Sequence, residues 1–378
     1  MIQFAINKTV FLQALNITKR AISSKNAIPV LSTVKIDVTT DGISLTGSNG
    51  QISIENYISV QDENAGLLVS QTGSILLEAA FFINVISSLP DIVVDFTEIE
   101  QKQVVLTSGK SEITLKGKEA ELYPRLQEVP ATTPLVLETK LLKQTINETA
   151  FAASTQESRP ILTGVHFVLS NHTELKTVAT DSHRMSQRKL QLEKAGDNFN
   201  VVIPSRSLRE FTSVFTDEVE TVEVFFSNNQ LLFRSDHISF YTRLLEGTYP
   251  DTDRLIPAEF NTSAVFDTAN LRHAMERARL LSNATQNGTV KLEIKDGSVT
   301  AHVHSPEVGK VNEELDALEV TGQDLVISFN PSYLIDSLKA VASEQVKVSF
   351  ISPVRPFTVV PNKEDESFIQ LITPVRTN

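Results

Sequence analysis

Apolar residues recur along this chain with two spacings, one helical and one extended. In three segments they fall three and four positions apart, which places them on one side of a helix. These segments are residues 7–22, 138–154 and 267–283. The apolar positions of the last segment are Leu271, Ala274, Met275 and Ala278. Asp267, just before this stripe, is suited to cap the first turn. The spacing therefore predicts three amphipathic helices.

After each of these helices, apolar and polar residues alternate on either side of a turn. Alternation with a period of two is typical of a strand with one buried face. The alternating segments are residues 32–48, 163–181 and 288–304. Their expected turns lie at Asp41-Gly42, Ser170-Asn171 and Asp296-Gly297. Since Asp-Gly favours the tight turns of hairpins, we expect antiparallel pairs here.

A second helix and further strands complete each set of elements. The second helices are predicted over residues 77–91, 203–218 and 329–344. Ser205 and Asn330 are the expected caps of the last two. The closing strands are predicted over residues 102–120, 229–247 and 352–376.

The same order of elements returns at a fixed interval. Tyr123-Pro124 and Tyr249-Pro250 lie 126 positions apart, which is a third of the 378 residues. Self-similarity at a fixed interval indicates repeated structural units. We therefore expect an α+β protein of three repeated domains, each with two helices and about eight short strands. The expected domains are residues 1–126, 127–254 and 255–378.

The composition excludes several classes of protein. There is no cysteine, which excludes disulfides, thiolate metal sites and a cysteine nucleophile. The first residues show no apolar stretch behind a basic start, and no segment is long enough to span a membrane. A cytoplasmic location without membrane contact is therefore expected. The net charge of −12 argues against contact with nucleic acid unless charge is segregated on the surface.

Basic residues do gather on the predicted helices. The first helical segment carries Lys8 and Arg20, with Lys25 after it, while Arg206 and Arg277 lie on helices of the second and third repeats. Acidic residues gather in the predicted loops and outer strands. Two interpretations stay open: these are ordinary solvated helix faces, or they contact phosphates. No base-reading motif is present, so any contact with DNA would lack sequence preference.

The run Asp181-Ser182-His183-Arg184 places an acid, a hydroxyl, an imidazole and a guanidinium side by side. Neighbours on an extended strand point to opposite faces, so Ser182 and His183 are poorly placed as nucleophile and base. No G-x-S-x-G motif is present to form a nucleophile elbow. An aspartate beside a turn often binds backbone amides, and we interpret Asp181 in this way.

Other sites for chemistry have little support. His302 and His304 face the same side of a predicted strand, but no third ligand lies nearby. Neither a Walker A motif nor a G-x-G-x-x-G motif occurs, so no metal, nucleotide or other cofactor is expected.

A binding groove explains the run Asp181-Ser182-His183-Arg184 better than a catalytic site does. Thr180, His183, Arg184 and Met185 fall where the second repeat must meet the third. Junctions between domains are usual places for ligands, and methionine makes an adaptable wall. We therefore expect a peptide site at this junction.

Several motifs make the chain resemble one known family. They are Leu45-Thr46-Gly47 and the runs ATDSHR, TYPD and LITPVR that begin at residues 179, 248 and 371. With these motifs the chain resembles the beta subunits of bacterial DNA polymerase III, the sliding clamps, over its whole length. The resemblance implies domains of two helices backed by two antiparallel sheets. It also implies a head-to-tail homodimer that closes into a ring of six domains, with the basic helices facing double-stranded DNA.

The resemblance implies a function without catalysis. The ring would tether a replicative polymerase to DNA, and this tethering would raise its local concentration. The implied partners are DNA, the replicative polymerase subunit, the clamp loader and other proteins with a clamp-binding peptide motif. The implied groove residues are Leu162, Thr180, His183, Arg184, Met185, Pro250, Leu255, Val354, Pro356, Leu371, Thr373, Pro374, Val375 and Arg376. Arg184 and Arg376 would meet peptide carbonyls or a carboxylate.

Family positions for DNA contact match Lys25, Gln156 and Arg159. Family positions for the dimer interface match Ile113 of one subunit and Leu280 and Leu281 of the other. The chain departs from the family pattern at two places. Pro160 and Ile161 stand where aromatic residues are frequent, which argues against base stacking there, and Ser182 stands where glycine is frequent.

Two other functions remain as hypotheses at this point. An enzyme centred on Asp181–Arg184 would lose its turnover when His183 is replaced. A repeat scaffold that binds only proteins would share the groove but would not be retained on DNA.

Overall fold

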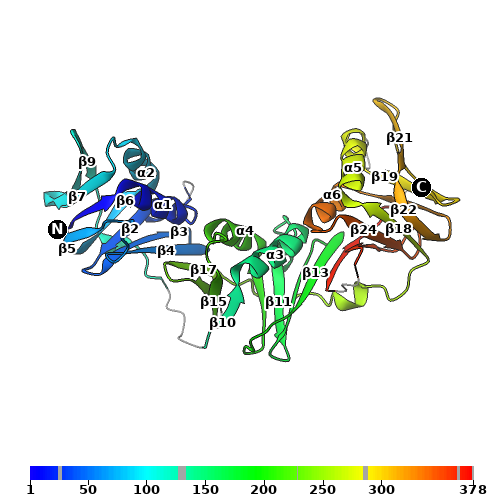
Figure 1. Ribbon diagram of the computed structural model, residues 1–378, viewed down its shortest axis with the longest axis horizontal. Coiled ribbons are helices and arrows are strands. Elements are labelled where there is room, and N and C mark those ends of the chain that lie inside the picture. Colours follow the sequence, from blue (N-terminus) through cyan, green and yellow to red (C-terminus); the bar gives the residue numbers. More distant parts are fainter. Residues whose placement is uncertain (24–27, 127–132, 228, 284–287, 364–366, 377–378) are drawn as a thin grey trace. The chain divides into compact units, whose positions relative to one another are not determined.

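The computed structural model describes residues 1–23, 28–126, 133–227, 229–283, 288–363 and 367–376 (Figure 1). The chain divides into two compact units. The first contains Met1–Lys140 and Glu210–Leu244, and the second contains Leu141–Arg209 and Leu245–Asn378. The division runs through the central third of the chain, so each unit holds part of it.

Six α-helices lie in the described chain where the apolar spacing predicts them. They are α1 (Lys8–Lys19), α2 (Ala79–Ser88), α3 (Thr139–Thr149), α4 (Ser205–Val214), α5 (Thr268–Ser282) and α6 (Pro331–Ala340). The short 3-10 helices are Pro29–Ser32, Glu100–Lys102, Ala120–Leu122, Ala150–Ala152, Pro160–Thr163 and Asp253–Leu255. All four apolar positions predicted for α5 are buried. Helices this short depend on such a packed stripe more than on intrinsic propensity.

Side-chain caps fix the start of two helices as predicted. Asp267 Oδ1 accepts a hydrogen bond from the Asn270 amide at 2.8 Å, and Asn330 Oδ1 accepts one from the Ser332 amide at 2.9 Å. The expected cap at Ser205 is wrong. The helix α4 begins at Ser205 itself, so this residue has helical geometry instead of the extended geometry of a cap.

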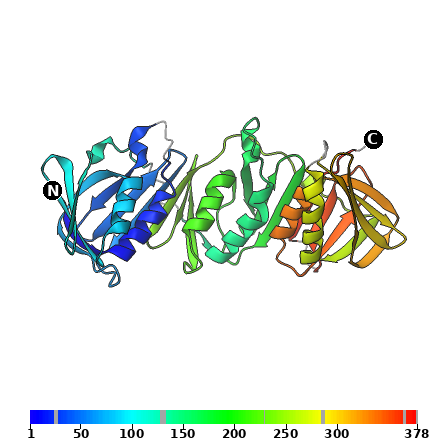
Figure 2. The same ribbon diagram turned by 90° about the horizontal axis from the view of Figure 1, so that it is seen from above.

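The first unit contains two antiparallel sheets. Their strand orders are β5-β1-β7-β8-β9 and β10-β15-β16-β17-β4-β3-β2-β6. The smaller sheet consists of β1 (Gln3–Asn7), β5 (Leu68–Gln71), β7 (Val93–Ile99), β8 (Gln103–Ser108) and β9 (Ser111–Lys116). The larger consists of β2 (Thr33–Val38), β3 (Gly42–Ser48), β4 (Ile52–Ser59), β6 (Gly73–Glu78), β10 (Leu135–Glu138), β15 (Thr221–Phe226), β16 (Gln230–Arg234) and β17 (Ile238–Arg243). The helices α1 and α2 pack side by side within this unit (Figure 2).

The second unit repeats this plan. Its strand orders are β14-β11-β12-β13-β26-β25-β24-β18-β22 and β21-β20-β19-β23. The larger sheet consists of β11 (Gly164–Ser170), β12 (Glu174–Thr180), β13 (Arg184–Gln191), β14 (Phe199–Pro204), β18 (Thr262–Asp267), β22 (Ala317–Gly322), β24 (Gln345–Phe350), β25 (Phe357–Pro361) and β26 (Phe368–Ile372). The smaller consists of β19 (Val290–Lys295), β20 (Ser298–Ser305), β21 (Gly309–Leu315) and β23 (Leu325–Phe329). Here α5 packs against α6.

Two strand pairs join different thirds of the chain. Ser53 lies opposite Tyr241 where β4 meets β17, and Met185 lies opposite Leu371 where β13 meets β26. Each large sheet is therefore continuous across a repeat boundary, which explains why the compact units divide the central third.

The predicted hairpin turns form at or beside the expected residues. Asp296 and Gly297 have φ angles of +50° and +80° between β19 and β20, as in the turns that Asp-Gly favours. In the second hairpin Asn171 and His172 have φ angles of +50° and +65°, so the turn lies one residue later than expected.

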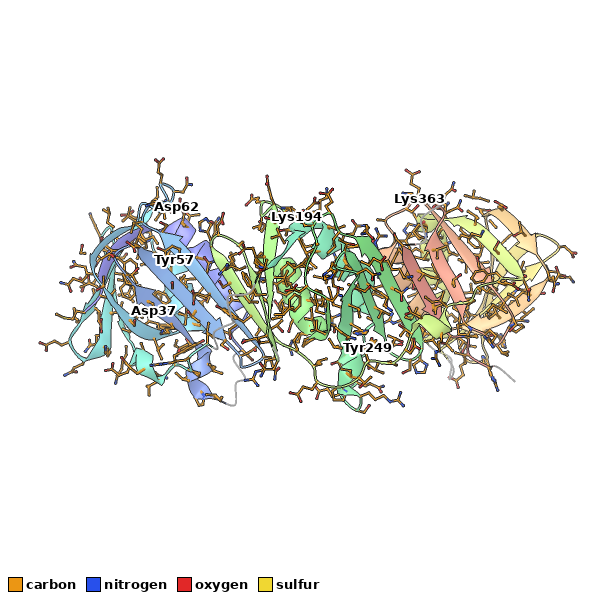
Figure 3. All side chains as sticks on the ribbon, turned by 90° about the horizontal axis from the view of Figure 1, so that it is seen from below. Asp37, Tyr57, Asp62, Lys194, Tyr249 and Lys363 are labelled. Carbon is orange, nitrogen blue, oxygen red and sulfur yellow. The ribbon has the colours of Figure 1, made fainter. Side chains whose placement is uncertain are left out.

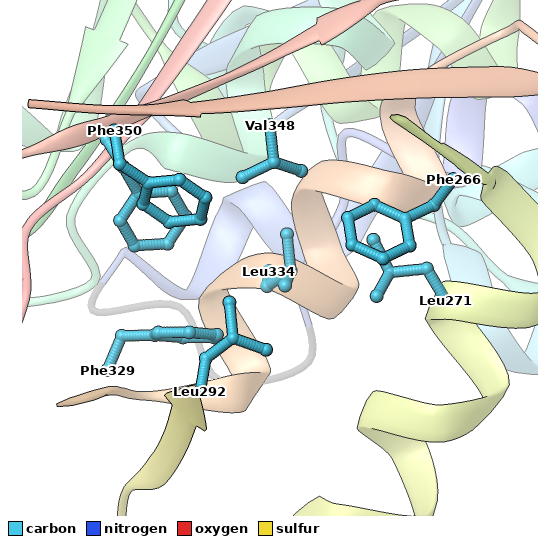
Figure 4. Close-up of a pocket in the computed structure, with 8 residues that line it drawn as sticks. Phe266, Leu271, Leu292, Phe329, Leu334, Val348 and Phe350 are labelled. Atoms are coloured by element: carbon cyan, nitrogen blue, oxygen red, sulfur yellow. The ribbon is translucent and has the colours of Figure 1, made fainter. Parts of the chain in front are cut away.

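Phenylalanine rings fill much of the cores. In the first unit Phe4 stacks on Phe96 with ring centroids 4.6 Å apart, and Phe211 of α4 meets Phe233 at 4.5 Å. In the second unit aromatic and aliphatic side chains surround Leu334 of α6 (Figure 4). Burying one such side chain stabilises the fold by about 1.5–3 kcal/mol, which holds the helices against the sheets.

Candidate functional site

The run from Asp181 to Arg184 forms the turn between β12 and β13. Asp181 Oδ1 accepts hydrogen bonds from the amides of His183 and Arg184, both at 2.9 Å. Thr180 Oγ1 accepts one from the Ser182 amide at 3.1 Å and donates one to the Arg184 carbonyl at 2.6 Å. These bonds satisfy backbone groups that the turn would otherwise leave unpaired. The prediction that Asp181 binds backbone amides is confirmed.

The same turn does not pair a nucleophile with a base. Ser182 Oγ accepts a hydrogen bond from Arg159 Nη1 at 3.5 Å. The His183 ring instead stacks with Tyr333, with centroids 6.3 Å apart and planes 12° apart. An activated serine needs a base within hydrogen-bond reach, so this geometry gives no support to hydrolysis.

Arg184 is held within the protein on several sides. Its Nε lies 3.1 Å from Asp181 Oδ2, and its Nη1 lies 2.7 Å from Asp336 Oδ2. The guanidinium carbon lies 4.9 Å from the ring centroid of Tyr333 and 5.5 Å from that of Phe151. Only 13% of the Arg184 side chain is exposed. Its charge is therefore engaged by carboxylates of the protein, whereas the sequence analysis assigned it to a bound peptide.

Beside the turn lies a small apolar cluster that is separate from the main cores. Its buried members are Leu162, Val178, Met185, Val202, Tyr249 and Leu371. Tyr249 is labelled in Figure 3. Its hydroxyl accepts a hydrogen bond from the Thr180 amide at 3.0 Å. Burial raises the pKa of Tyr249 well above its ordinary value of 10. The cluster forms a floor whose Tyr249 is fixed to Thr180, the last residue of β12 before the turn.

The other expected groove residues are more exposed. Leu255 is 51% and Val354 54% exposed, and Pro250, Thr373, Val375 and Arg376 are exposed too. Pro356 and Pro374 are half-buried. The last segment is tied to its neighbours by the Thr373 amide, which donates to the His183 carbonyl at 2.8 Å, and the Val375 amide, which donates to the Ser328 carbonyl at 2.7 Å. Ile256, the neighbour of Leu255 in the chain, packs against the buried cluster. The buried floor is therefore followed closely in the chain by exposed apolar side chains.

Two residues of α6 at this site were not found from the sequence. Tyr333 contacts both His183 and Arg184, and Asp336 forms an ion pair with Arg184. Burial raises the pKa of Tyr333. The pairs lie about 150 positions apart in the chain, so no local pattern joins them.

The residues expected to meet DNA have varied surroundings. Gln156 and Arg159 are exposed, with Arg159 close to the turn of Ser182, and Arg206 is exposed on α4. Arg20 is exposed and lies 3.4 Å from Glu210. Lys8 Nζ instead donates to the Leu89 carbonyl at 2.7 Å, at the end of α2. Lys25 lies outside the described residues.

Acids of α5 itself and of a distant strand pair with arginines of α5. Arg277 donates from two nitrogens to the Glu313 carboxylate on β21, and Arg272 pairs with Glu276 at 2.9 Å. Hydrogen bonding to Glu313 raises the pKa of Arg277 further. The sequence placed Arg277 on a basic helix and left open whether this face is solvated or meets phosphates. The pairing with Glu313 was not found because β21 (Gly309–Leu315) is remote from Arg277 in the chain.

The expected interface residues lie at accessible places. Ile113 is half-buried on β9, which ends the five-stranded sheet of the first unit. Near the end of α5, Leu280 is 75% exposed, while Leu281 is half-buried against the core of the second unit.

Within the described residues, no group of three or more His, Asp or Glu side chains could hold a metal ion. His302 hydrogen-bonds Thr300 Oγ1 and Asn312 Oδ1, both at 2.9 Å. No helix of the described chain is long and apolar enough to cross a membrane.

Comparisons with known proteins give matches along nearly all of the chain. Family models of the DNA polymerase III beta subunit match it in three parts. They are the N-terminal domain at residues 2–127, the central domain at 136–251 and the C-terminal domain at 253–376. The chain belongs to the DNA polymerase III beta subunit family.

Individual members of this family are similar to this chain over its whole length. The beta sliding clamp of Streptococcus pneumoniae is 77% identical over all 378 residues of both chains. The solved structure of the DNA polymerase III beta chain from Streptococcus pneumoniae is 77% identical. It aligns with this chain over the whole length of both, with a TM-score of 0.99. The beta subunit from Streptococcus pyogenes, 70% identical over both whole chains, has a TM-score of 0.97.

Membership in the beta subunit family decides between the functional hypotheses. A beta sliding clamp is a processivity factor of DNA replication, so the chain is an accessory subunit and not an enzyme. The α+β repeat fold and the resemblance stated from the motifs are confirmed. The hypothesis of an enzyme centred on Asp181–Arg184 is wrong.

Proposed function

We propose that two copies of this chain join head to tail and close into a ring around duplex DNA. Two sheet edges suit this contact, because β9 ends the five-stranded sheet and β21 ends the four-stranded sheet. Unpaired strand edges and an exposed leucine such as Leu280 are surfaces that association covers. The two edges differ, so the contact is heterologous and closes when the subunits complete a circle. The proposed domains are residues 1–126, 127–254 and 255–378, and the limits of the family matches support them.

We further propose that enclosure, and not tight binding, retains the DNA. Arg159 and Arg206 are exposed and suited to weak phosphate contact, as is Gln156. Arg20 is exposed as well, but it pairs with Glu210. Lys8 and Arg277 are engaged with Leu89 and Glu313, which lowers the contact they can make. With few phosphates neutralised, the ring slides without sequence preference. We place this activity in the cytoplasm, where bacterial DNA is replicated.

We propose that the groove beside residues 181–183 receives short peptides of the replicative polymerase, the clamp loader and other replication and repair proteins. The observation that carries this is the buried floor of Leu162, Met185 and Leu371, against which Ile256 packs. The exposed Leu255 and Val375 lie within four positions of Ile256 and Leu371 in the chain. An apolar anchor side chain of the peptide would cover these exposed groups.

The peptide test uses a fluorescein-labelled hexapeptide that ends in Leu-Phe, which supplies an aliphatic and an aromatic anchor. Leu255→Asp should weaken its binding about 30-fold, because a buried apolar contact worth about 2 kcal/mol is lost. Leu122→Asp replaces an equally exposed leucine far from the groove in sequence and serves as the control. Equal affinities of the two variants would refute the groove.

The ring test compares a nicked circular plasmid with the same plasmid after linearisation. A clamp loaded on the circle by its clamp loader should stay bound during gel filtration at high salt, where phosphate contacts are screened. It should be lost from the linear form, because it slides off the ends. Equal loss from both forms would favour the remaining alternative, a scaffold that binds only proteins.

A further inference from the structure

Arg184 connects two parts of the second unit that the sequence separates. Side chains along β13 alternate between the faces of the sheet, so Met185 joins the apolar floor while Arg184 and Ser186 face the helices. On that side Ser186 Oγ donates to the Glu148 carbonyl of α3. The strand that forms the groove floor is therefore held from behind by polar contacts with helices.

The helix α6 supplies most of the contacts on this side. Tyr333, Asp336 and Ser337 share one of its faces, since they lie three and four positions apart. Tyr333 and Asp336 contact Arg184, and the Ser337 carbonyl accepts a hydrogen bond from Gln370 Nε2 of β26 at 3.3 Å. The helix thus binds both β13 and β26, the strands that meet at the repeat boundary.

We propose that Asp336 is a positioning residue of the peptide groove: its carboxylate holds the Arg184 guanidinium and, through it, the turn of residues 181–183. The contacts run from Asp336 to Arg184 and from Arg184 to Asp181, whose other oxygen binds the amides of His183 and Arg184. The His183 carbonyl in turn accepts the Thr373 amide at the exposed groove wall. This inference rests on the proposed peptide groove and adds an element behind it.

Loss of the Asp336 charge should loosen the turn without unfolding the unit. Asp336 is 39% exposed and Arg184 keeps Asp181 as a partner, so no charge is left buried and unpaired. An asparagine at position 336 keeps the shape but gives a weaker, uncharged hydrogen bond.

The experiment measures binding of the labelled Leu-Phe hexapeptide to Asp336→Asn, Arg184→Gln and the double variant. Asp336→Asn should weaken binding about tenfold, as a coupling of this kind typically does, with little change in melting temperature. The double variant should bind no more weakly than Arg184→Gln alone, because Asp336 acts through Arg184. Glu344→Gln removes an exposed charge just after α6 and should leave binding unchanged.

A second measurement needs no peptide. Hydrogen exchange of the amides of His183 and Arg184 should be faster in Asp336→Asn than in the unaltered chain. Unchanged exchange, or losses of affinity that multiply in the double variant, would overturn the positioning role. Faster exchange in a protein whose unaltered form fails to bind the peptide would support the positioning role and overturn the peptide groove instead.

Discussion

Ser182 has a backbone conformation that residues with a Cβ seldom adopt. Its φ angle is +77°, in the left-handed region. The turn requires this angle, because Asp181 can then bind the amides of His183 and Arg184. A glycine would adopt this angle without strain, and the serine here needs no catalytic role.

Ser182→Val should destabilise the protein by about 1–2 kcal/mol, because a β-branched side chain is strained at positive φ. Ser182→Gly should be at least as stable as the unaltered chain. Urea unfolding midpoints of the three proteins measure this difference. Equal midpoints for the valine and glycine variants would contradict the strain.

Tyr249 makes stability depend on alkaline pH. In the unfolded chain its phenol ionises near pH 10, whereas burial raises its pKa in the folded chain. Only the unfolded state loses this proton as the pH rises above 10, so the free energy of unfolding falls there by about 1.4 kcal/mol per pH unit. Below pH 10 this contribution is fully present.

In Tyr249→Phe the free energy of unfolding should fall less steeply above pH 10, because one fewer proton is released on unfolding. The variant should also be less stable at neutral pH by about 1–3 kcal/mol, since the buried Thr180 amide loses its acceptor. Unfolding by urea at several pH values from neutral to 11 tests both effects. Tyr57→Phe, which removes an exposed hydrogen bond to the Asp41 carbonyl, is the control at neutral pH. An unchanged pH dependence would contradict the assigned role of burial.

At the scale of elements, the first residues of the helices show what the local sequence determines and what it does not. Asp267 and Asn330 cap α5 and α6 through bonds to amides two or three residues later, so the sequence predicts them. Ser205 has the same chemistry, yet α4 begins on it. The residue type favours a cap, but it does not by itself fix which residue begins the helix.

Asp267→Ala should destabilise the protein by about 1 kcal/mol, because the Asn270 amide at the start of α5 loses its acceptor. Asn270→Ala leaves the amide and its acceptor in place and should change stability much less. Thermal unfolding of both variants measures the difference. Equal effects would show that the Asp267 side chain contributes nothing as a cap.

At the scale of the whole molecule, the exposed edges of each chain matter most. The strands β9 and β21 each end a sheet, and Leu280 is exposed beside the end of α5. A closed ring would cover these groups, whereas a single chain leaves them in water. Association therefore carries the proposed function, because an open chain cannot enclose DNA.

Leu280→Lys should convert a dimer into folded single chains. A lysine in the interface costs desolvation energy, but at a position 75% exposed in one chain it should leave the fold intact. Light scattering after gel filtration measures the mass, and circular dichroism measures the fold. Leu122→Lys, 61% exposed in the first unit, should leave the mass unchanged. A Leu280→Lys protein that keeps the mass of two chains would contradict the proposed interface.

The sequence by itself determined the elements and their repetition. Helices at Leu271–Ala278 and turns at Asp296-Gly297 follow from spacing and backbone preference, which act over a few residues. Motifs such as ATDSHR then identified the family, and the resemblance implied the peptide groove that we propose. The amide-binding role of Asp181 was also predictable, because its partners are its neighbours.

Only the tertiary structure decided which distant residues meet. The joining of β13 to β26, the capture of Arg184 by Asp336 and the neutralisation of Arg277 by Glu313 all link residues far apart in the chain. Alternation shows that a strand has a buried face, but it does not name the neighbouring strand. Charge counts likewise show how many acids are present and not which arginine each one approaches. These contacts depend on packing of the folded chain. They determine which side chains of the proposed groove and of the helix surfaces remain available for binding.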